Sequence, residues 1–215
     1  MLEVFKQVIV RGEPRQLSEL VAQITRDPAT GWARNSEREP PGKPKLEAGH
    51  DIAVFRWGGG PTSPASDLFI VGRGDRLEVT NIVPVDVPRL SRTQYNTSVD
   101  DFVKRNVSKR ARALQLNVEV TPDHLPITHW LTGDAAGLLT AFSKSANRSI
   151  LHPLDAERWR AFLIRAHLDQ TTLDTETLFR WLTEEERWPE DKAESLILEF
   201  EFALQLLSDF DNRRL

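Results

Sequence analysis

The chain contains no cysteine, so disulfides, thiolate metal sites and a cysteine nucleophile are all excluded. The absence of cysteine fits a reducing cytosol. The sequence also lacks a run of about 20 apolar residues, which a membrane-spanning helix requires, and residues 1–6 show no secretory signal pattern. We therefore expect a cytoplasmic protein without a membrane partner. Because most of its basic residues are arginine, we also expect a bacterial source.

Short motifs for nucleotide, metal and nucleophile sites are missing as well. The glycines of Trp57-Gly58-Gly59-Gly60 follow a predicted strand, but Pro61 comes next instead of a Lys-Ser/Thr pair or a helix. They therefore predict a connection and not a phosphate loop. His124 and His129 lie five residues apart, which does not place two metal ligands on one helix face. We predict no metal site and no cofactor.

Charge is distributed unevenly along the 215 residues. The sequence pI of 5.8 and the net charge of −4 argue against general affinity for nucleic acid, which needs concentrated Lys and Arg. Residues 151–215 carry 15 Asp and Glu against 8 Lys and Arg, a net charge of −7, so residues 1–150 sum to +3. The chain thus offers two regions of opposite sign, an arrangement suited to docking against partners.

The first part of the chain combines short apolar runs, typical of strands, with two helical patterns. Leu17, Leu20, Val21 and Ile24 form one apolar helical stripe, and a second helix is expected from an N-cap at Ser98 to about residue 114. Residues 72–75 contain two glycines and predict a hairpin turn. The expected strands are residues 2–10, 32–33, 52–57, 68–71, 77–83 and 116–120.

The remainder of the chain is predicted to be helical. Helices are expected over about residues 134–146 and then from starts near Pro153, Asp174 and Pro189. The predicted fold class is α+β: a mixed or antiparallel sheet of about five to six strands with two helices, followed by an all-helical part. We divide the chain into a sheet domain, residues 1–122, and an acidic helical part, residues 123–215, packed on the first. The apolar stripe expected on the last helix comprises Ala193, Leu196, Ile197, Phe200, Leu204 and Leu207.

The densest group of chemically capable side chains lies in residues 147–155. His152 with Asp155 three residues later resembles an oriented base, and Ser149 or Asp134 would complete a hydrolase or nuclease site. Helix-end preferences explain the same residues without chemistry: Pro153 suits a first turn, and Asp155 suits the positive end of the helix dipole. The second interpretation is the stronger one, because each residue fits a known position at a helix start.

A basic run on the second predicted helix gives another candidate surface. Its members are Lys104, Arg105, Lys109, Arg110 and Arg112, and a solvated helix face is the simplest interpretation. Among functional interpretations an acidic protein partner is favoured over nucleic acid, because no aromatic residue is interleaved with these charges to stack on bases. A nucleic-acid-associated subunit using residues 104–112 stays as an alternative.

Six tryptophans accompany a single tyrosine. Helical patterns place Trp159 and Trp181 on core faces, whereas Trp32, Trp57 and Trp130 are not assigned to a core. Because tryptophan is enriched in binding hot spots, we predict that any exposed member of this second group anchors an interface. With the charge distribution and the missing motifs, this favours a non-catalytic protein-binding component of the bacterial cytosol: an immunity protein, an antitoxin or a complex subunit.

Overall fold

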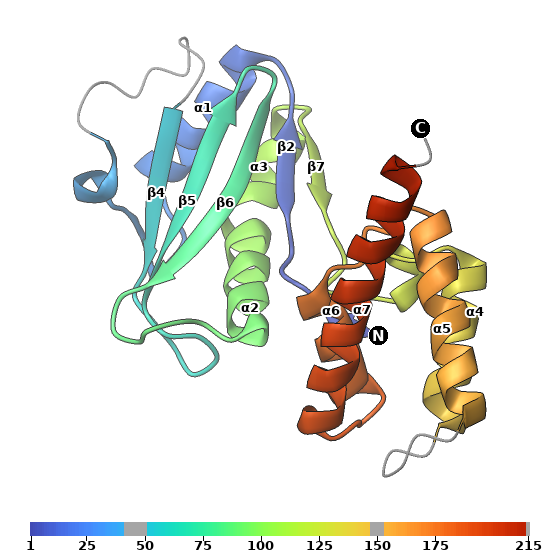
Figure 1. Ribbon diagram of the computed structural model, residues 1–215. Coiled ribbons are helices and arrows are strands. Elements are labelled where there is room, and N and C mark those ends of the chain that lie inside the picture. The colour runs from blue at the N-terminus through green and yellow to red at the C-terminus, as the bar shows by residue number, and fades with distance from the viewer. Residues whose placement is uncertain (41–50, 147–152, 214–215) are drawn as a thin grey trace. The chain divides into compact units, whose positions relative to one another are not determined.

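The computed structural model describes residues 1–40, 51–146 and 153–213. The chain forms two compact units, one made of Glu3–Asp123 and the other of Met1–Leu2 with His124–Leu215. We call them the sheet unit and the helical unit. The predicted α+β class is confirmed: the chain contains a six-stranded antiparallel sheet with helices, followed by an all-helical region (Figure 1).

Every pair of neighbouring strands in the sheet unit is antiparallel, in the order β3-β4-β5-β6-β2-β7. The hairpin predicted at residues 72–75 joins β5 to β6, and Gly74 occupies a left-handed conformation with φ of 61°, which glycine adopts without strain. A separate two-stranded sheet pairs β1 (Leu2–Glu3) with β8 (His124–Leu125). The six strands are β2 (Val8–Arg11), β3 (Trp32–Arg34), β4 (Asp51–Trp57), β5 (Ser66–Arg73), β6 (Arg76–Pro84) and β7 (Asn117–Val120).

Helices cover one face of this sheet, and the core of the unit lies between the two layers (Figure 1). α1 (Pro14–Arg26) contributes Leu17, Leu20, Val21 and Ile24, as its predicted stripe requires. α2 (Arg92–Phe102), the π-helical turn η2 (Val103–Val107) and α3 (Ser108–Ala113) follow one another directly. A short 3-10 turn, η1 (Ser36–Arg38), follows β3.

The start of the second helix differs from the prediction. Ser91, not Ser98, is the N-cap, because the Ser91 side chain accepts from the Gln94 N–H and the Gln94 side chain accepts from the Ser91 N–H. This reciprocal capping box satisfies two backbone donors at the helix start. Ser98 lies inside α2 and is buried.

The strand predicted over residues 2–10 is interrupted at its middle. The Asn96 side chain accepts from the Lys6 N–H and donates to the Val4 carbonyl, each at 2.8 Å, so this stretch pairs with α2 instead of a strand. A buried side chain far along the sequence thus satisfies backbone groups that a continuous strand would have paired.

The helical unit contains α4 (Gly133–Ser145), α5 (Pro153–Leu168), α6 (Thr175–Arg180) and α7 (Glu190–Asn212). Two short elements accompany them, the 3-10 turn η3 (Ile127–His129) and the π-helical turn η4 (Trp181–Glu185). The predicted N-cap at Asp174 is correct, because its carboxylate accepts from the Thr177 N–H at 2.6 Å.

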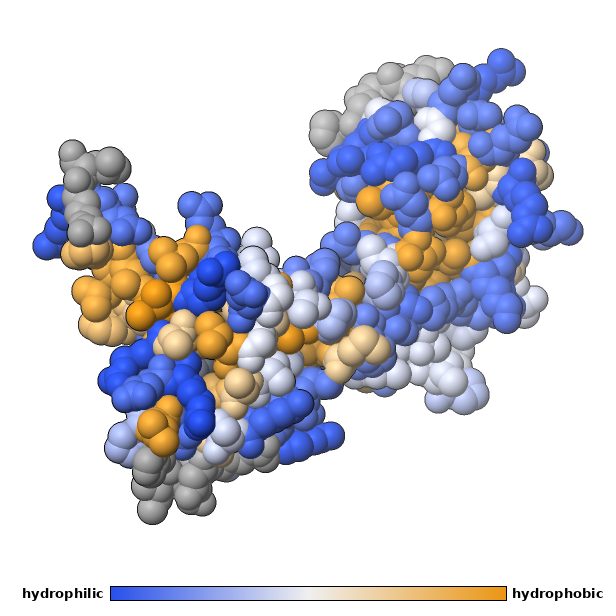
Figure 2. Space-filling view, turned by 90° about the vertical axis from the view of Figure 1, so that its right-hand side faces the viewer, coloured by the Kyte–Doolittle hydropathy of each residue, from blue (hydrophilic) through white to orange (hydrophobic). Residues whose placement is uncertain are grey.

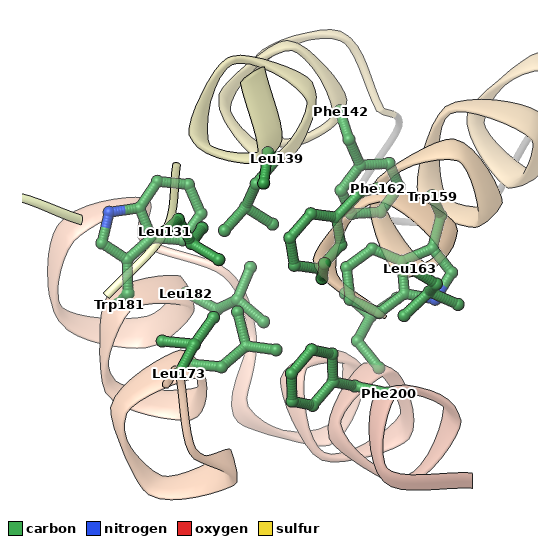
Figure 3. Packing of buried hydrophobic residues seen from close by; sticks show 14 of the residues in the cluster. Leu131, Leu139, Phe142, Trp159, Phe162, Leu163, Leu173, Trp181, Leu182 and Phe200 are labelled. Carbon is green, nitrogen blue, oxygen red and sulfur yellow. The ribbon is translucent and has the colours of Figure 1, made fainter. Parts of the chain in front are cut away.

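Aromatic side chains fill the core of the helical unit (Figure 3). Phe162 of α5 is fully buried and stacks on Phe200 of α7, with ring centroids 6.0 Å apart. Phe142 of α4 stacks on Trp188 at 5.4 Å. The indole N–H of Trp188 donates to the hydroxyl of Ser143 at 2.8 Å, so its polar atom is satisfied within the core.

Candidate interaction surface

The structure places only part of the predicted catalytic group. Ser149 and His152 lie outside the described residues. Asp155 is buried in the first turn of α5, and its carboxylate pairs with Arg158 at 3.1 Å. Asp134 is exposed at the start of α4 and pairs with Arg165 at 3.4 Å. Both aspartates therefore lie in the first turn of a helix and pair with an arginine of α5.

The three unassigned tryptophans have packing roles. Trp32 is 4% exposed, lies in the sheet unit's core, and donates its indole N–H to Asp101 at 2.7 Å. Trp57 is half-buried against the same core, and its ring lies against Gly31, where a Cβ would come within 2.3 Å of it. Trp130 is half-buried against the core of the helical unit. Trp32 is therefore not exposed to a partner, whereas Trp57 and Trp130 keep part of their surface accessible.

Two residues of the predicted basic run bind the sheet unit's own backbone. Arg105 donates to the Thr30 carbonyl at 2.8 Å, and Arg110 donates to the Asp27 carbonyl and pairs with the Asp27 carboxylate at 3.3 Å. Between them, the Asn106 side chain accepts from the Ala29 N–H at 2.9 Å. These contacts fix the connection from α1 to β3. Lys104, Lys109 and Arg112 are exposed on the same helical segment.

The perturbed ionisable groups belong to structural contacts. Burial alone would raise the pKa of the Asp67 carboxyl, but hydrogen bonds from Arg56 and Asn35 outweigh it and lower that pKa. Burial raises the pKa of the Tyr95 hydroxyl. In the described parts of the chain, no group of three or more His, Asp or Glu side chains is placed to hold a metal ion.

Each unit has an open groove. In the sheet unit, a groove of about 740 Å³ lies beside the second half of β6, where β2 no longer pairs with it, and residues 5–9 and 88–90 line its other walls. In the helical unit, a groove of about 420 Å³ lies between α5 and α7, where His167 and Asp211 bond at 2.8 Å. Neither groove gathers a set of convergent catalytic groups.

The most distinctive surface feature is on α7. Leu198, Phe202, Leu206 and Phe210 are between 52% and 68% exposed, and they recur every four residues, so they form one row along the helix. We call this row the α7 stripe. Figure 2 shows hydrophobic surface exposed on the helical unit.

A second apolar row on the same helix is buried. It includes Ala193, Leu196 and Phe200, and it was predicted from the sequence. At about 100° per residue, Leu196 and Phe200 point away from Leu198 and Phe202, so α7 is apolar on two opposite sides. The sequence does contain a signal for the exposed row, namely a second set of apolar residues on the same helix. A helix that is hydrophobic beyond one stripe requires contacts on more than one side. The pattern of apolar residues predicted the buried row of α7 but not the exposed one.

The α7 stripe is set in an acidic helix. The twenty residues from Ala193 to Asn212 contain five acidic and no basic side chains. Glu199 lies three residues before Phe202, Glu201 lies three residues after Leu198, and both are exposed. Residues three apart are surface neighbours on a helix, so these carboxylates flank the stripe.

No helix in the described residues is long and apolar enough to cross a bilayer. No protein-family description, curated protein or solved structure matches this chain.

Proposed function

We propose that this protein is a non-catalytic protein-binding component of the bacterial cytoplasm, a complex subunit or a protein of the immunity or antitoxin kind, and that it binds its partner through the α7 stripe. The observation that carries the proposal is an exposed row of four large apolar side chains on α7, of which Leu198 and Phe202 point away from the helix's own core. Exposed apolar patches of this kind mark interaction sites in soluble proteins.

The flanking polar side chains support this assignment. A binding surface generally has an apolar centre and a charged rim, and Glu199 and Glu201 border the centre of the α7 stripe. Neighbouring members of the row are also spaced four residues apart, a spacing that occurs among the anchors of helix-mediated recognition.

Because the chain contains no cysteine, one introduced cysteine can be labelled at a single chosen position. A single Phe202→Cys substitution carrying a photo-crosslinker on its thiol reports only on the α7 stripe. In lysate of the organism that encodes the chain, we expect one dominant crosslinked protein, and we expect Leu198→Ser with Leu206→Ser to abolish that product. Mass spectrometry identifies the captured chain.

The matched control is Ile164→Cys on α5, which replaces another large apolar residue that is 51% exposed. The α5 position should not give the same dominant product. Equal crosslinking from both positions, or none from Phe202→Cys, would contradict the proposed function.

A further inference from the structure

The charges around the α7 stripe define its partner more closely, an inference that rests on the proposed function. Glu199 and Glu201 make no ion pair within the described residues, and Asp209 accepts only a neutral hydrogen bond, from the Gln205 amide at 3.0 Å. These carboxylates are therefore uncompensated next to an apolar row. A binding partner would bring them into a less polar environment, where a complementary positive charge is favourable and a negative charge is not.

The shape of the stripe favours a helix as its occupant. Leu198 and Phe210 are twelve residues apart, which corresponds to about 18 Å along a helix axis. A row at four-residue spacing forms a ridge inclined to the helix axis, and such ridges pack into the grooves of another helix. Helix-in-groove and helix-pair recognition both place apolar anchors once per turn.

The negative charge of α7 makes a second copy of the chain and a membrane surface poor candidates for binding to the α7 stripe. Pairing α7 with α7 of another copy would bring two helices together whose last twenty residues each carry five acidic and no basic side chains. Like charges across an interface are unfavourable. Anionic lipid headgroups would be repelled by the same carboxylates.

We propose that the α7 stripe docks an amphipathic helix of another protein, apolar along its contact face and flanked by Lys or Arg side chains that meet Glu199, Glu201 and Asp209. The apolar contacts supply the attraction between the two helices. The carboxylates select a basic partner over an acidic one.

The test uses the full chain with a single Phe202→Cys substitution carrying an environment-sensitive fluorophore. The probes are two synthetic amphipathic peptides of about 14 residues, about four helical turns, with the same leucine positions and either lysine or glutamate at all others. A lysine peptide of the same composition in permuted order, without an apolar face, is the third probe. We expect the patterned Leu/Lys peptide to bind at least about tenfold more tightly than either other peptide.

Variants separate the contribution of the apolar side chains to binding from that of the carboxylates. Leu198→Ser with Leu206→Ser should weaken binding of the patterned Leu/Lys peptide at least about tenfold, and Glu199→Lys with Glu201→Lys should remove its advantage over the Leu/Glu peptide. Ile164→Ser on α5 should leave both affinities unchanged. Equal binding of the permuted lysine peptide, or no effect of the leucine substitutions, would show that net charge alone causes binding and would overturn the inference.

The remaining outcomes distinguish this inference from the proposed function. If the Phe202→Cys thiol reacts as slowly with a maleimide in the folded chain as a core thiol does, another part of the same chain covers the stripe, and both proposals fail. If light scattering shows a dimer that Phe202→Ser dissociates, the occupant is a second copy. If the lysate crosslink forms but the Leu/Lys preference is absent, protein binding stands and the basic helix is wrong.

Discussion

The sheet unit and the helical unit use their interiors differently. The sheet unit buries several polar side chains that hold its backbone in place, among them Asn96, Asn106 and Asp67. The helical unit has an interior dominated by stacked aromatic rings, and it leaves the α7 stripe exposed. Buried polar side chains fix the loops of the sheet unit, whereas exposed apolar side chains such as Leu198 and Phe202 lie outside the buried core of the helical unit. The comparison shows that buried polar groups hold the backbone of the sheet unit, and that large apolar side chains stay exposed on a helix of the helical unit.

The largest expected effect tests the aromatic core of the helical unit. Phe162→Ala should lower the free energy of unfolding by about 3–5 kcal/mol, because it removes a fully buried ring and leaves a cavity beside Trp159 and Phe200. Urea denaturation followed by circular dichroism measures the loss. A loss below about 1 kcal/mol would mean that the ring is not packed as described.

The next prediction tests the buried side-chain hydrogen bonds of the sheet unit. Asn96→Ala should cost about 1–3 kcal/mol, because the Lys6 N–H and the Val4 carbonyl both lose their partner. Asn117→Ala is the matched control, since Asn117 is exposed and bonds only to Glu119. Equal unfolding midpoints for the two variants would contradict a structural role for Asn96.

A smaller effect, of about 1 kcal/mol at neutral pH, is expected for Asp67→Asn, since Arg56 is partly exposed to solvent. The folded state lowers the pKa of the Asp67 carboxyl below its ordinary value of 3.8. The ionised group therefore stabilises the fold above that value, and this contribution is lost as the pH falls through the folded pKa. The difference in unfolding free energy between wild type and Asp67→Asn should shrink below about pH 4. A difference that stays constant down to pH 2 would exclude this linkage.

The smallest effect sharpens the contrast between the two sides of α7. Phe202→Ser should change the free energy of unfolding by less than about 0.5 kcal/mol, because the ring is already 68% exposed. Phe200→Ala, two residues earlier and 2% exposed, should cost about 3–5 kcal/mol. Thermal and urea unfolding of the two variants give the comparison. A large loss for Phe202→Ser would show that its ring is covered in solution.

Local pattern was sufficient to predict much of the fold. The stripe from Leu17 to Ile24, the glycine hairpin before β6 and the cap at Asp174 all follow from spacing and from backbone preferences that act over a few residues. The interruption between β1 and β2 could not be predicted in this way. It depends on Asn96, about ninety residues away in sequence, reaching the backbone of Val4 and Lys6.

The candidate interaction surface likewise has features that the sequence predicts and features that depend on tertiary contacts. The sequence by itself determined that α7 is acidic and apolar, and it identified the row containing Leu196 and Phe200. Only the tertiary structure decided that this row is buried while the α7 stripe stays exposed, and that Trp32 belongs to a core. The hydrophobic effect has no direction. Apolar residues in a sequence therefore indicate that burial is favourable, but they do not indicate which face of a helix the neighbouring elements will cover.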